Sequence, residues 1–421
     1  MHFSESRGQF LNTVQDALRR YDSQLKEINY KIWSNPELAY AEHQAHDHIC
    51  ELFESLQAEG YGDYTVHRQV YSLDTAFEVE YTHGKGGHIV IFNAEYDALP
   101  GIGHACGHNL IATSSIAAFI ATCEAMKAHA QSMAGSGFTL RLLGTPAEES
   151  GGGKVHLLNK GAYKGVDACL MVHPIPLIPA APTLQGMATV VEGGFLANHK
   201  VKVTFTGRSA HAAAAPWEGV NALDAVVAAY LNVSLLRQQI LPSQRVHGVI
   251  VNGGERPNII PASATLDYYI RSPTVSSLED LKEKVLRCFE AAATATGCTL
   301  EYNWGPSYAD LKTNMPICES YVAAMQAMGH HTVLDDSGQK NALGGGSTDM
   351  GNVSYAVPGF HGLFTIPTEG VNHTPQFTSG AGSSESFQRA LACAAGMAVV
   401  ACQILIDDKF AGDVKRYFDE H

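Results

Sequence analysis

Short, largely hydrophobic runs divide the first half of the chain into alternating strands and helices. Three of them, Ile89–Phe92, Leu140–Leu143 and Cys169–Val172, have the length and composition typical of strands buried on both faces. Between the first two, hydrophobic residues from Ile111 to Cys123 recur at helical spacing. This alternation predicts an α/β fold with a largely parallel sheet.

The pattern changes between residues 196 and 306. Lys200–Phe205 alternates polar and apolar positions, as a half-exposed antiparallel strand does. A helix, two strands, a second helix and a last strand follow, which is the β-α-β-β-α-β order of a ferredoxin-like module. A capping box formed by Ser276 and Glu279 predicts where the second helix begins.

The α/β pattern returns after residue 306, with a predicted strand over Gly359–Ile366 and an apolar helix over Ser384–Ile406. We therefore predict a mixed, largely parallel sheet flanked by helices. The larger domain, which contains this sheet, comprises residues 1–195 and 307–421, and a ferredoxin-like α+β domain is inserted over residues 196–306.

Composition narrows the functional classes. The 421 residues include 28 Lys and Arg against 42 Asp and Glu, a formal charge of −14, which argues against nucleic acid as a partner. We expect no membrane-spanning helix, no secretory signal at the N-terminus and no lipidation tag. The nine cysteines are scattered without framework spacing. The expectation is a soluble protein of the reducing cytoplasm.

The densest chemical motif is Gly103–Asn109. In an extended segment alternate residues point the same way, so Cys106 and His108 can converge on one metal ion. A buried cysteine beside a glycine turn is the alternative, and an isolated cysteine would favour it. The glycine spacing of this segment misses the dinucleotide-binding fingerprint by one residue, so that function is discarded.

Three further residues strengthen the metal hypothesis. Glu149, in the pair Glu148-Glu149, follows a predicted strand, and His173 and His373 also lie at or after strand ends. Singly, the pair is more often a solvated turn and each histidine an ordinary polar residue. Because open α/β sheets place ligand sites at the carboxyl ends of their strands, convergence with Cys106 predicts a zinc-class centre.

The inserted module carries three candidate substrate contacts. His211 follows its first strand and can donate a hydrogen bond to a developing oxyanion, although a surface histidine is an equal alternative. Arg271 ends its third strand, where a guanidinium suits a substrate carboxylate, and Asn258 lies in the preceding loop. A surface arginine is the default at such a position.

Several longer motifs are recognisable as a family pattern. They are Asn35–Leu38, the run from Glu95 to His108, Trp217–Ala222, Gly346–Asp349 and Asn372–Thr374. Through them the chain resembles the dinuclear-zinc peptidases of metallopeptidase family twenty, which include aminoacylases, carboxypeptidase G and auxin-conjugate hydrolases. The branch of β-alanyl-lysine (carnosine-type) dipeptidases is the most similar.

The resemblance implies two divalent metal ions, zinc first, with manganese, cobalt and nickel as alternatives. Cys106 takes the place of the family's bridging aspartate. His108 and His173 would complete one metal site, and Glu149 and His373 the other. One departure matters, because Glu95 stands where most of the family has a histidine ligand. Whether Glu95 contacts metal is left open.

The resemblance also implies that residues 1–195 and 307–421 form the catalytic domain and that residues 196–306 form its lid domain. It further implies the catalytic roles of single residues. Glu148 matches the general base, Asp97 an aspartate that orients a ligand, and His211 the lid histidine that stabilises the tetrahedral intermediate. The substrate-binding residues would be Asn258, Arg271, Gly345 and Gly346. Relatives commonly dimerise through the lid domain, so a homodimer is expected, in which His211 can serve its own or the neighbouring subunit.

The expected activity is metal-dependent hydrolysis of an amide bond in a dipeptide or N-acyl amino acid with a free carboxylate. β-Alanyl and γ-aminobutyryl dipeptides with a basic C-terminal residue come first, and N-acyl amino acids or aminobenzoyl-glutamate are alternatives. Two other hypotheses stay open. One makes Cys106 a covalent nucleophile with His108 or His104 as base, and the other is a non-catalytic scaffold.

Overall fold

The computed structural model describes residues 3–129, 137–188, 194–334 and 346–421. The chain forms two compact units. The first comprises Met1–Val191, Lys312–Ala342 and Asn352–His421. The second comprises Glu192–Leu311 and Leu343–Gly351.

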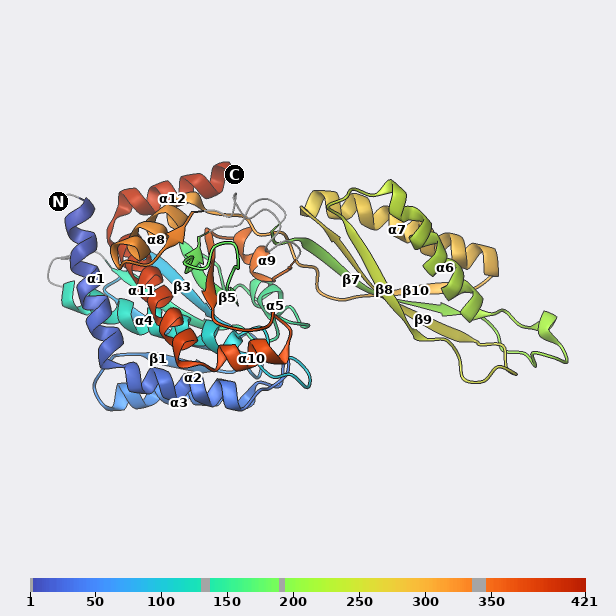
Figure 1. The fold of residues 1–421 in the computed structure, drawn as a ribbon, viewed down its shortest axis with the longest axis horizontal. Helices are drawn as coiled ribbons and strands as arrows, with labels where there is room; N and C mark the ends of the chain where they lie inside the picture. The colour runs from blue at the N-terminus through green and yellow to red at the C-terminus, as the bar shows by residue number, and fades with distance from the viewer. Residues whose placement is uncertain (1–2, 130–136, 189–193, 335–345) are drawn as a thin grey trace. The chain divides into compact units, whose positions relative to one another are not determined.

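The first unit is built on an eight-stranded sheet in the order β1-β2-β4-β3-β5-β12-β6-β11 (Figure 1). Its strands are β1 (Thr65–Arg68), β2 (Phe77–His83), β3 (His88–Ala94), β4 (Phe138–Gly144), β5 (Ala168–Pro176), β6 (Gly186–Met187), β11 (Thr332–Val333) and β12 (Gly359–Ile366). The central neighbours β4, β3, β5 and β12 are parallel, whereas β1 and β2 are antiparallel at one edge. This arrangement confirms the predicted mixed α/β sheet.

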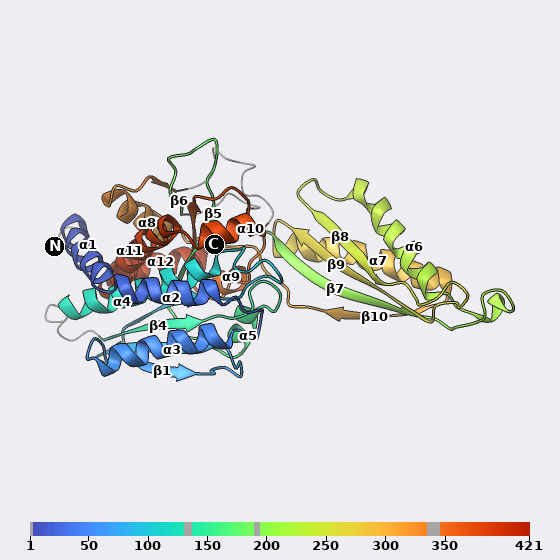
Figure 2. The ribbon, with the colours of Figure 1, turned by 60° about the horizontal axis from the view of Figure 1, so that its bottom comes forward.

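Helices flank this sheet. They are α1 (Phe3–Arg20), α2 (Asp22–Ser34), α3 (His43–Ala58), α4 (His108–His129), α5 (Gly153–Asn159), α8 (Met315–Ala327), α9 (Met350–Ser354), α10 (Pro375–Ala381), α11 (Ser384–Ile406) and α12 (Asp408–Glu420). Helices α4 and α11 pack on one another and on the central strands, and α1 packs against both (Figure 2). The main hydrophobic core lies between these helices and the sheet.

Helices α4 and α11 are long and apolar enough to cross a membrane by length and composition. This differs from the expectation that the sequence holds no such stretch. Both helices are core elements, because 94% and 83% of their most apolar windows are buried inside the protein. Burial on nearly every side accounts for their uniform hydrophobicity.

The second unit is an antiparallel sheet in the order β10-β7-β9-β8, with two long helices packed against it (Figure 1). Its elements are β7 (Ala197–Thr206), α6 (Ala222–Leu236), β8 (Arg245–Asn252), β9 (Ser263–Ser272), α7 (Val275–Thr296) and β10 (Thr299–Trp304), with short 3-10 helices at Pro216–Glu218 and Arg237–Gln239. The alternating inward residues of the strands and the apolar stripes of α6 and α7 form its core. This is the predicted ferredoxin-like order.

The predicted capping box of the second helix of this unit is wrong by two positions. The N-cap of α7 is Thr274, whose side chain accepts the N–H of Ser277, while the Ser277 hydroxyl accepts the N–H of Thr274. Glu279 instead pairs with His199 at 2.6 Å and with Lys282 at 3.0 Å. The helix therefore starts at Val275 with a box made of two hydroxyl residues.

Candidate active site

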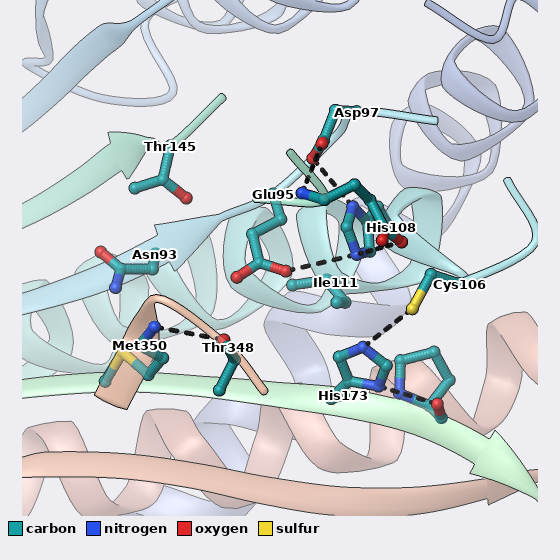
Figure 3. A network of polar contacts seen from close by, with 12 residues as sticks. Asn93, Glu95, Asp97, Cys106, His108, Ile111, Thr145, His173, Thr348 and Met350 are labelled. Carbon is teal, nitrogen blue, oxygen red and sulfur yellow. Dashed lines mark hydrogen bonds and ion pairs between the residues drawn. The ribbon is translucent and has the colours of Figure 1, made fainter. Parts of the chain in front are cut away.

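The predicted ligands lie where the parallel strands of the first unit end. Glu95 and Asp97 follow β3, Glu149 follows β4, and His373 lies in the loop after β12. His173 corrects the expectation, because it lies within β5 rather than beyond its end. Since parallel strands share one carboxyl edge, these segments meet there although they are far apart in sequence. Figure 3 shows Glu95, Asp97, Cys106, His108 and His173 close to one another.

The sequence pattern predicts an extended segment over Cys106–His108, and this prediction is wrong: the chain turns at Gly107 and enters a helix. Gly107 has φ of +77°, and His108 is the first residue of α4. A Cβ at Gly107 would lie 2.5 Å from Pro174 Cγ, so only glycine lets the turn approach β5 so closely. That approach brings Cys106 Sγ to 3.3 Å from His173 Nε2 (Figure 3).

The structure brings all five predicted metal ligands together in two sets that share Cys106. Within each set the potential ligand atoms lie within 4.8 Å of one another. One set is Cys106, His108 and His173, and the other is Cys106, Glu149 and His373. Glu149 Oε1 lies 3.4 Å from His373 Nε2 and 3.8 Å from His108 Nε2.

Hydrogen bonds fix how two of the histidines face this cluster. His108 Nδ1 donates to Asp97 Oδ1 at 2.9 Å, and His173 Nδ1 donates to the Pro174 carbonyl at 2.8 Å. Both rings therefore present Nε2 to the cluster, as metal-binding histidines do. The other oxygen of Asp97 accepts the N–H of Glu149 at 3.0 Å, so Asp97 orients both a histidine and the glutamate loop.

Burial and charge set the protonation states. Burial alone would raise the pKa of Asp97 and lower that of His108, but their mutual attraction reverses both shifts. In the metal-free protein they form an ion pair, and a metal ion would displace the proton on His108 Nε2. Burial, with the charge of His108, lowers the pKa of His173 to about 4, so this imidazole is neutral and able to bind metal.

The same environment disfavours Cys106 as a free nucleophile. Burial and the neighbouring Glu149 raise the pKa of its thiol well above the ordinary range. A neutral thiol is a poor nucleophile, whereas a divalent cation would stabilise the thiolate. A buried, neutral thiol therefore favours a metal ligand over a covalent catalyst.

Three buried polar atoms indicate that a metal ion fits this cluster. His108 Nε2, Glu149 Oε1 and Glu95 Oε2 make no hydrogen bond to any residue that the structure describes. Leaving such polar atoms buried without a hydrogen bond costs free energy. Together with the sulfur of Cys106 they form a mixed sulfur, nitrogen and oxygen donor set, which suits a zinc-class divalent cation.

Glu148 lies at the edge of this cluster. Its side chain is 8% exposed, and one of its oxygens forms a third close group with Glu95 and His108. The preceding residue, Ala147, has φ of +60° and donates its N–H to Glu42 Oε1 at 2.8 Å. A strained residue held by a buried carboxylate thus sets the direction of the glutamate pair.

Glu42 is a functional candidate that the sequence argument missed. It is fully buried, and its second oxygen accepts the hydroxyl of Thr75 at 2.8 Å. Burial, with the charge of Asp97, raises the pKa of Glu42 to about 7. No local motif marks it, because its partners are more than 30 residues away in sequence.

Lys154 was also missed. It lies in the first turn of α5, and its Nζ is 2.5 Å from Glu95 Oε1. Its position directly after the glycines that follow Glu148-Glu149 is a signal that could have been used.

His211 and Asn258 are neighbours in the second unit. His211 is exposed, and its Nδ1 accepts the N–H groups of Ala213 and Ala214 at 3.2 and 3.1 Å. The neutral ring therefore carries its proton on Nε2, where it can donate. The N–H of Ala212 donates to the Asn258 carbonyl at 3.1 Å, which ties the two segments together.

Arg271 lies near the end of β9, and the Tyr269 ring centre is 5.5 Å from its guanidinium. Its Nη1 donates to Ser347 Oγ at 2.8 Å and its Nε to His247 Nε2 at 3.3 Å. The neighbouring Gly346 accepts the N–H of Leu196 at 2.7 Å, which fixes the Ser347 segment. Gly345 lies outside the described residues.

The chain is similar in sequence and fold to proteins that are described as hydrolases. Residues 197–296 match the peptidase dimerisation domain of the M20 family. The chain is 40% identical over 402 residues to the mouse Xaa-Arg dipeptidase, covering 94% of this chain and 88% of the relative. It is 30% identical over 334 residues to one of the subunits of the Escherichia coli p-aminobenzoyl-glutamate hydrolase, covering 75% of this chain and 65% of that subunit.

A solved structure shows the same fold. A Bacillus subtilis protein described as a dinuclear metal-binding peptidase of the M20 family superposes with a TM-score of 0.64 at 18% identity, covering 92% of this chain and 99% of its own. The relatives confirm the predicted family and the predicted class of enzyme, a metallo-dipeptidase or amidohydrolase. This chain belongs to the M20 family of metallopeptidases.

Proposed function

We propose that the protein hydrolyses dipeptides that carry a free carboxylate and a basic C-terminal residue. The observation that carries the proposal is the buried glutamate Glu148 beside two overlapping sets of metal-ligand atoms. The name of the mouse relative, an Xaa-Arg dipeptidase, supports a basic C-terminal residue. β-Alanyl and γ-aminobutyryl groups remain the first candidates for the N-terminal part.

When bound, two divalent ions acidify a water molecule and polarise the scissile carbonyl. Glu148 takes the proton of the attacking water and returns it to the leaving amine. Asp97 keeps the His108 ring and the Glu149 backbone in place during this step. The two ions would be held by Cys106, His108, Glu149, His173 and His373, with Cys106 common to both sets.

The second unit supplies substrate contacts in this proposal. His211 donates from Nε2 to the oxygen that becomes negative as the carbonyl is attacked. Arg271 and Asn258 hold the terminal carboxylate, and Ser347 fixes the Arg271 guanidinium by accepting from its Nη1. Gly346, next to Ser347, is proposed to line the substrate.

We propose zinc as the first candidate for the metal, with manganese, cobalt and nickel as alternatives, because the donors mix sulfur, nitrogen and oxygen. The reducing cytoplasm is the proposed compartment. The nine free cysteines, eight of them buried, support it.

A homodimer through the second unit is part of the proposal. The match to a peptidase dimerisation domain supports it. So does the exposed apolar surface of α6, where Val227, Leu231 and Leu235 lie four residues apart with 43%, 56% and 75% of their surface exposed. The edge strand β8 also exposes Val249 and Val251. Replacing Leu231 and Leu235 with glutamate should give a monomer in light scattering.

A substrate panel tests the activity. The purified protein, loaded with zinc or with manganese, would be assayed on β-alanyl-lysine, β-alanyl-arginine, γ-aminobutyryl-lysine, α-aminoacyl-arginine and β-alanyl-glutamate. Each basic substrate is paired with its C-terminal amide. We expect the highest kcat/KM on free-carboxylate basic dipeptides. Equal rates on the amides, or faster cleavage of β-alanyl-glutamate, would contradict the proposal.

A second candidate function is hydrolysis of aminobenzoyl-glutamate or N-acyl amino acids. The E. coli relative, named for p-aminobenzoyl-glutamate, favours it. Including p-aminobenzoyl-glutamate and N-acetyl amino acids in the panel separates the two functions, because each predicts a different preferred substrate.

A further inference from the structure

Glu95 and Lys154 form a buried ion pair beside the ligand cluster. Lys154 Nζ lies 2.5 Å from Glu95 Oε1, and both residues are fully buried. A lysine is almost never buried so completely unless it is paired. Lys154 belongs to α5, which begins directly after the loop that carries Glu148 and Glu149. The pair therefore joins the end of β3 to the glutamate loop.

The two oxygens of Glu95 have different surroundings. Oε1 faces Lys154. Oε2 faces the cluster, 3.6 Å from His108 Nε2 (Figure 3). Both oxygens are buried and neither accepts a hydrogen bond from the described residues, so the ion-pair contact of Oε1 with Lys154 is what distinguishes them. Glu95 also forms a close group with His108 and Glu148, with their ligand atoms within 4.8 Å. One oxygen thus contacts a cation of the protein, and the other lies near His108, which belongs to one of the two ligand sets.

Charge explains why a lysine is needed here. The carboxylates of Glu148, Glu149 and Asp97 already lie at the cluster. A further buried carboxylate without a cation beside it would be strongly unfavourable in the protein before metal binds. A cation fixed on the far oxygen compensates that charge without occupying the cluster.

We propose that Glu95 contributes a single oxygen donor to the metal centre and that Lys154 is the positioning residue that restricts it to one oxygen. The inference rests on the proposed function, since it assumes that the cluster binds divalent cations. Lys154 holds Oε1 and directs Oε2 toward His108. Most of the family has a neutral histidine ligand at the position of Glu95. In this chain the carboxylate of Glu95 and the ammonium group of Lys154 together are also neutral.

Metal binding and thermal unfolding test the proposal together. Affinity for Zn²⁺ and for Mn²⁺ would be measured by chelator competition and elemental analysis on the full chain, for the wild type and for Glu95→Gln, Lys154→Met and the double variant. We expect Glu95→Gln to weaken one of the two metal equivalents by about 10–100-fold, the usual effect of losing a group that supports a metal site.

Lys154→Met should lower the melting temperature of the metal-free protein, because Glu95 is left buried and uncompensated. Metal should then raise the melting temperature of Lys154→Met more than that of the wild type, since the ion balances the charge of Glu95 in place of Lys154. The double variant should recover the metal-free melting temperature but keep the weakened metal binding.

A matched control exists in the same unit. Glu78 and Arg141 form another buried ion pair, and Glu78 also accepts a hydrogen bond from Tyr71. Glu78→Gln should change the metal-free melting temperature and leave the shift caused by metal at the wild-type value. A change of that shift as large as in Lys154→Met would overturn the proposal.

The remaining outcomes are decisive as well. Wild-type affinity of Glu95→Gln for both metal equivalents, or an unchanged metal-induced shift in Lys154→Met, would overturn the proposal. If Lys154→Met does not fold even with metal, the affinity of Glu95→Gln for Zn²⁺ and Mn²⁺ decides whether Glu95 is a metal ligand. A wild-type protein that binds no metal would refute the proposed function itself, which separates the two failures.

Discussion

The two units differ in how far their reactive groups are buried and in what holds these groups in place. In the first unit Glu95, Asp97 and His108 are at most 1% exposed, and hydrogen bonds or ion pairs fix their orientation before any ligand binds. In the second unit His211 and Asn258 are exposed, and the contacts that hold them involve neighbouring backbone groups. Arg271 is intermediate, held through its hydrogen bond to Ser347.

This difference indicates a division of labour. A metal centre needs its donors fixed, since misplacing a ligand loses affinity and activity. Substrate contacts can be completed when the substrate arrives. Variants in the first unit should therefore change metal content, kcat and stability, whereas variants in the second should leave metal content unchanged and alter substrate turnover or binding.

The largest effect is expected at Glu148. Glu148→Ala should lower kcat by about 10³–10⁴-fold, because it removes the group that moves the proton. The five metal ligands stay in place, so elemental analysis should still find the wild-type metal content. Turnover near the wild-type rate would show that another residue is the base.

His211 should come next. His211→Ala should lower kcat by about 10²–10³-fold, the usual effect of losing one oxyanion donor, with unchanged metal content. Loss of metal together with activity would contradict the division between the units.

Subunit mixing sharpens this prediction. If His211 serves the neighbouring subunit, mixing inactive Glu148→Ala with inactive His211→Ala should restore activity, because one site of each mixed dimer then has both residues. If His211 serves its own chain, the mixture stays inactive, as should each variant mixed with itself.

A pH-dependent effect on stability is expected at Glu42. The pKa of this buried carboxyl is raised to about 7, so between about pH 4.5 and pH 7 the folded protein keeps a proton that the unfolded chain releases. Folding stability from this group therefore falls as pH rises through that window. Above pH 7 the full free-energy cost of burying the ionised Glu42 carboxylate is present.

Glu42→Gln removes this cost while its amide can still accept from Ala147 and donate to Thr75. In the metal-free protein the variant should be more stable than the wild type by about 3 kcal/mol at pH 8, with a much smaller gain at pH 5. Urea unfolding at both pH values measures this difference. An equal gain at both would contradict the burial of an ionisable Glu42.

The smallest effect is expected at Arg271. Arg271→Ala should raise KM by about 10–30-fold for substrates with a free carboxylate, since it removes one charged hydrogen-bonding partner. The carboxyl-blocked amides are the control, and their already low kcat/KM should not change. An equal loss on both kinds of substrate would contradict the anchoring role.

Much of the fold could be predicted because hydrophobic periodicity reports burial directly. The buried strands β3, β4 and β5 follow their apolar runs. The capping box of α7 was placed wrongly because serine, threonine and glutamate can each fill its positions, and only the backbone shows that Thr274 begins the helix.

The candidate site was predictable as far as its residues lie in recognisable motifs. Cys106 and Glu149 lie in such motifs, and the structure brings them together. The supporting contacts were not predictable, because they join distant segments: Glu42 reaches Ala147 across 105 residues, and Lys154 reaches Glu95. The left-handed turn at Gly107 was likewise missed, since a glycine alone does not reveal its φ.

Elemental analysis of the purified protein, followed through exhaustive dialysis against a chelator, tests the central claim most directly. The claim is that the cluster around Cys106 holds two divalent ions that the reaction needs. We expect two equivalents of a transition metal per chain, loss of activity in step with their removal, and recovery when zinc or manganese is returned. Full activity in protein without stoichiometric metal would contradict the account.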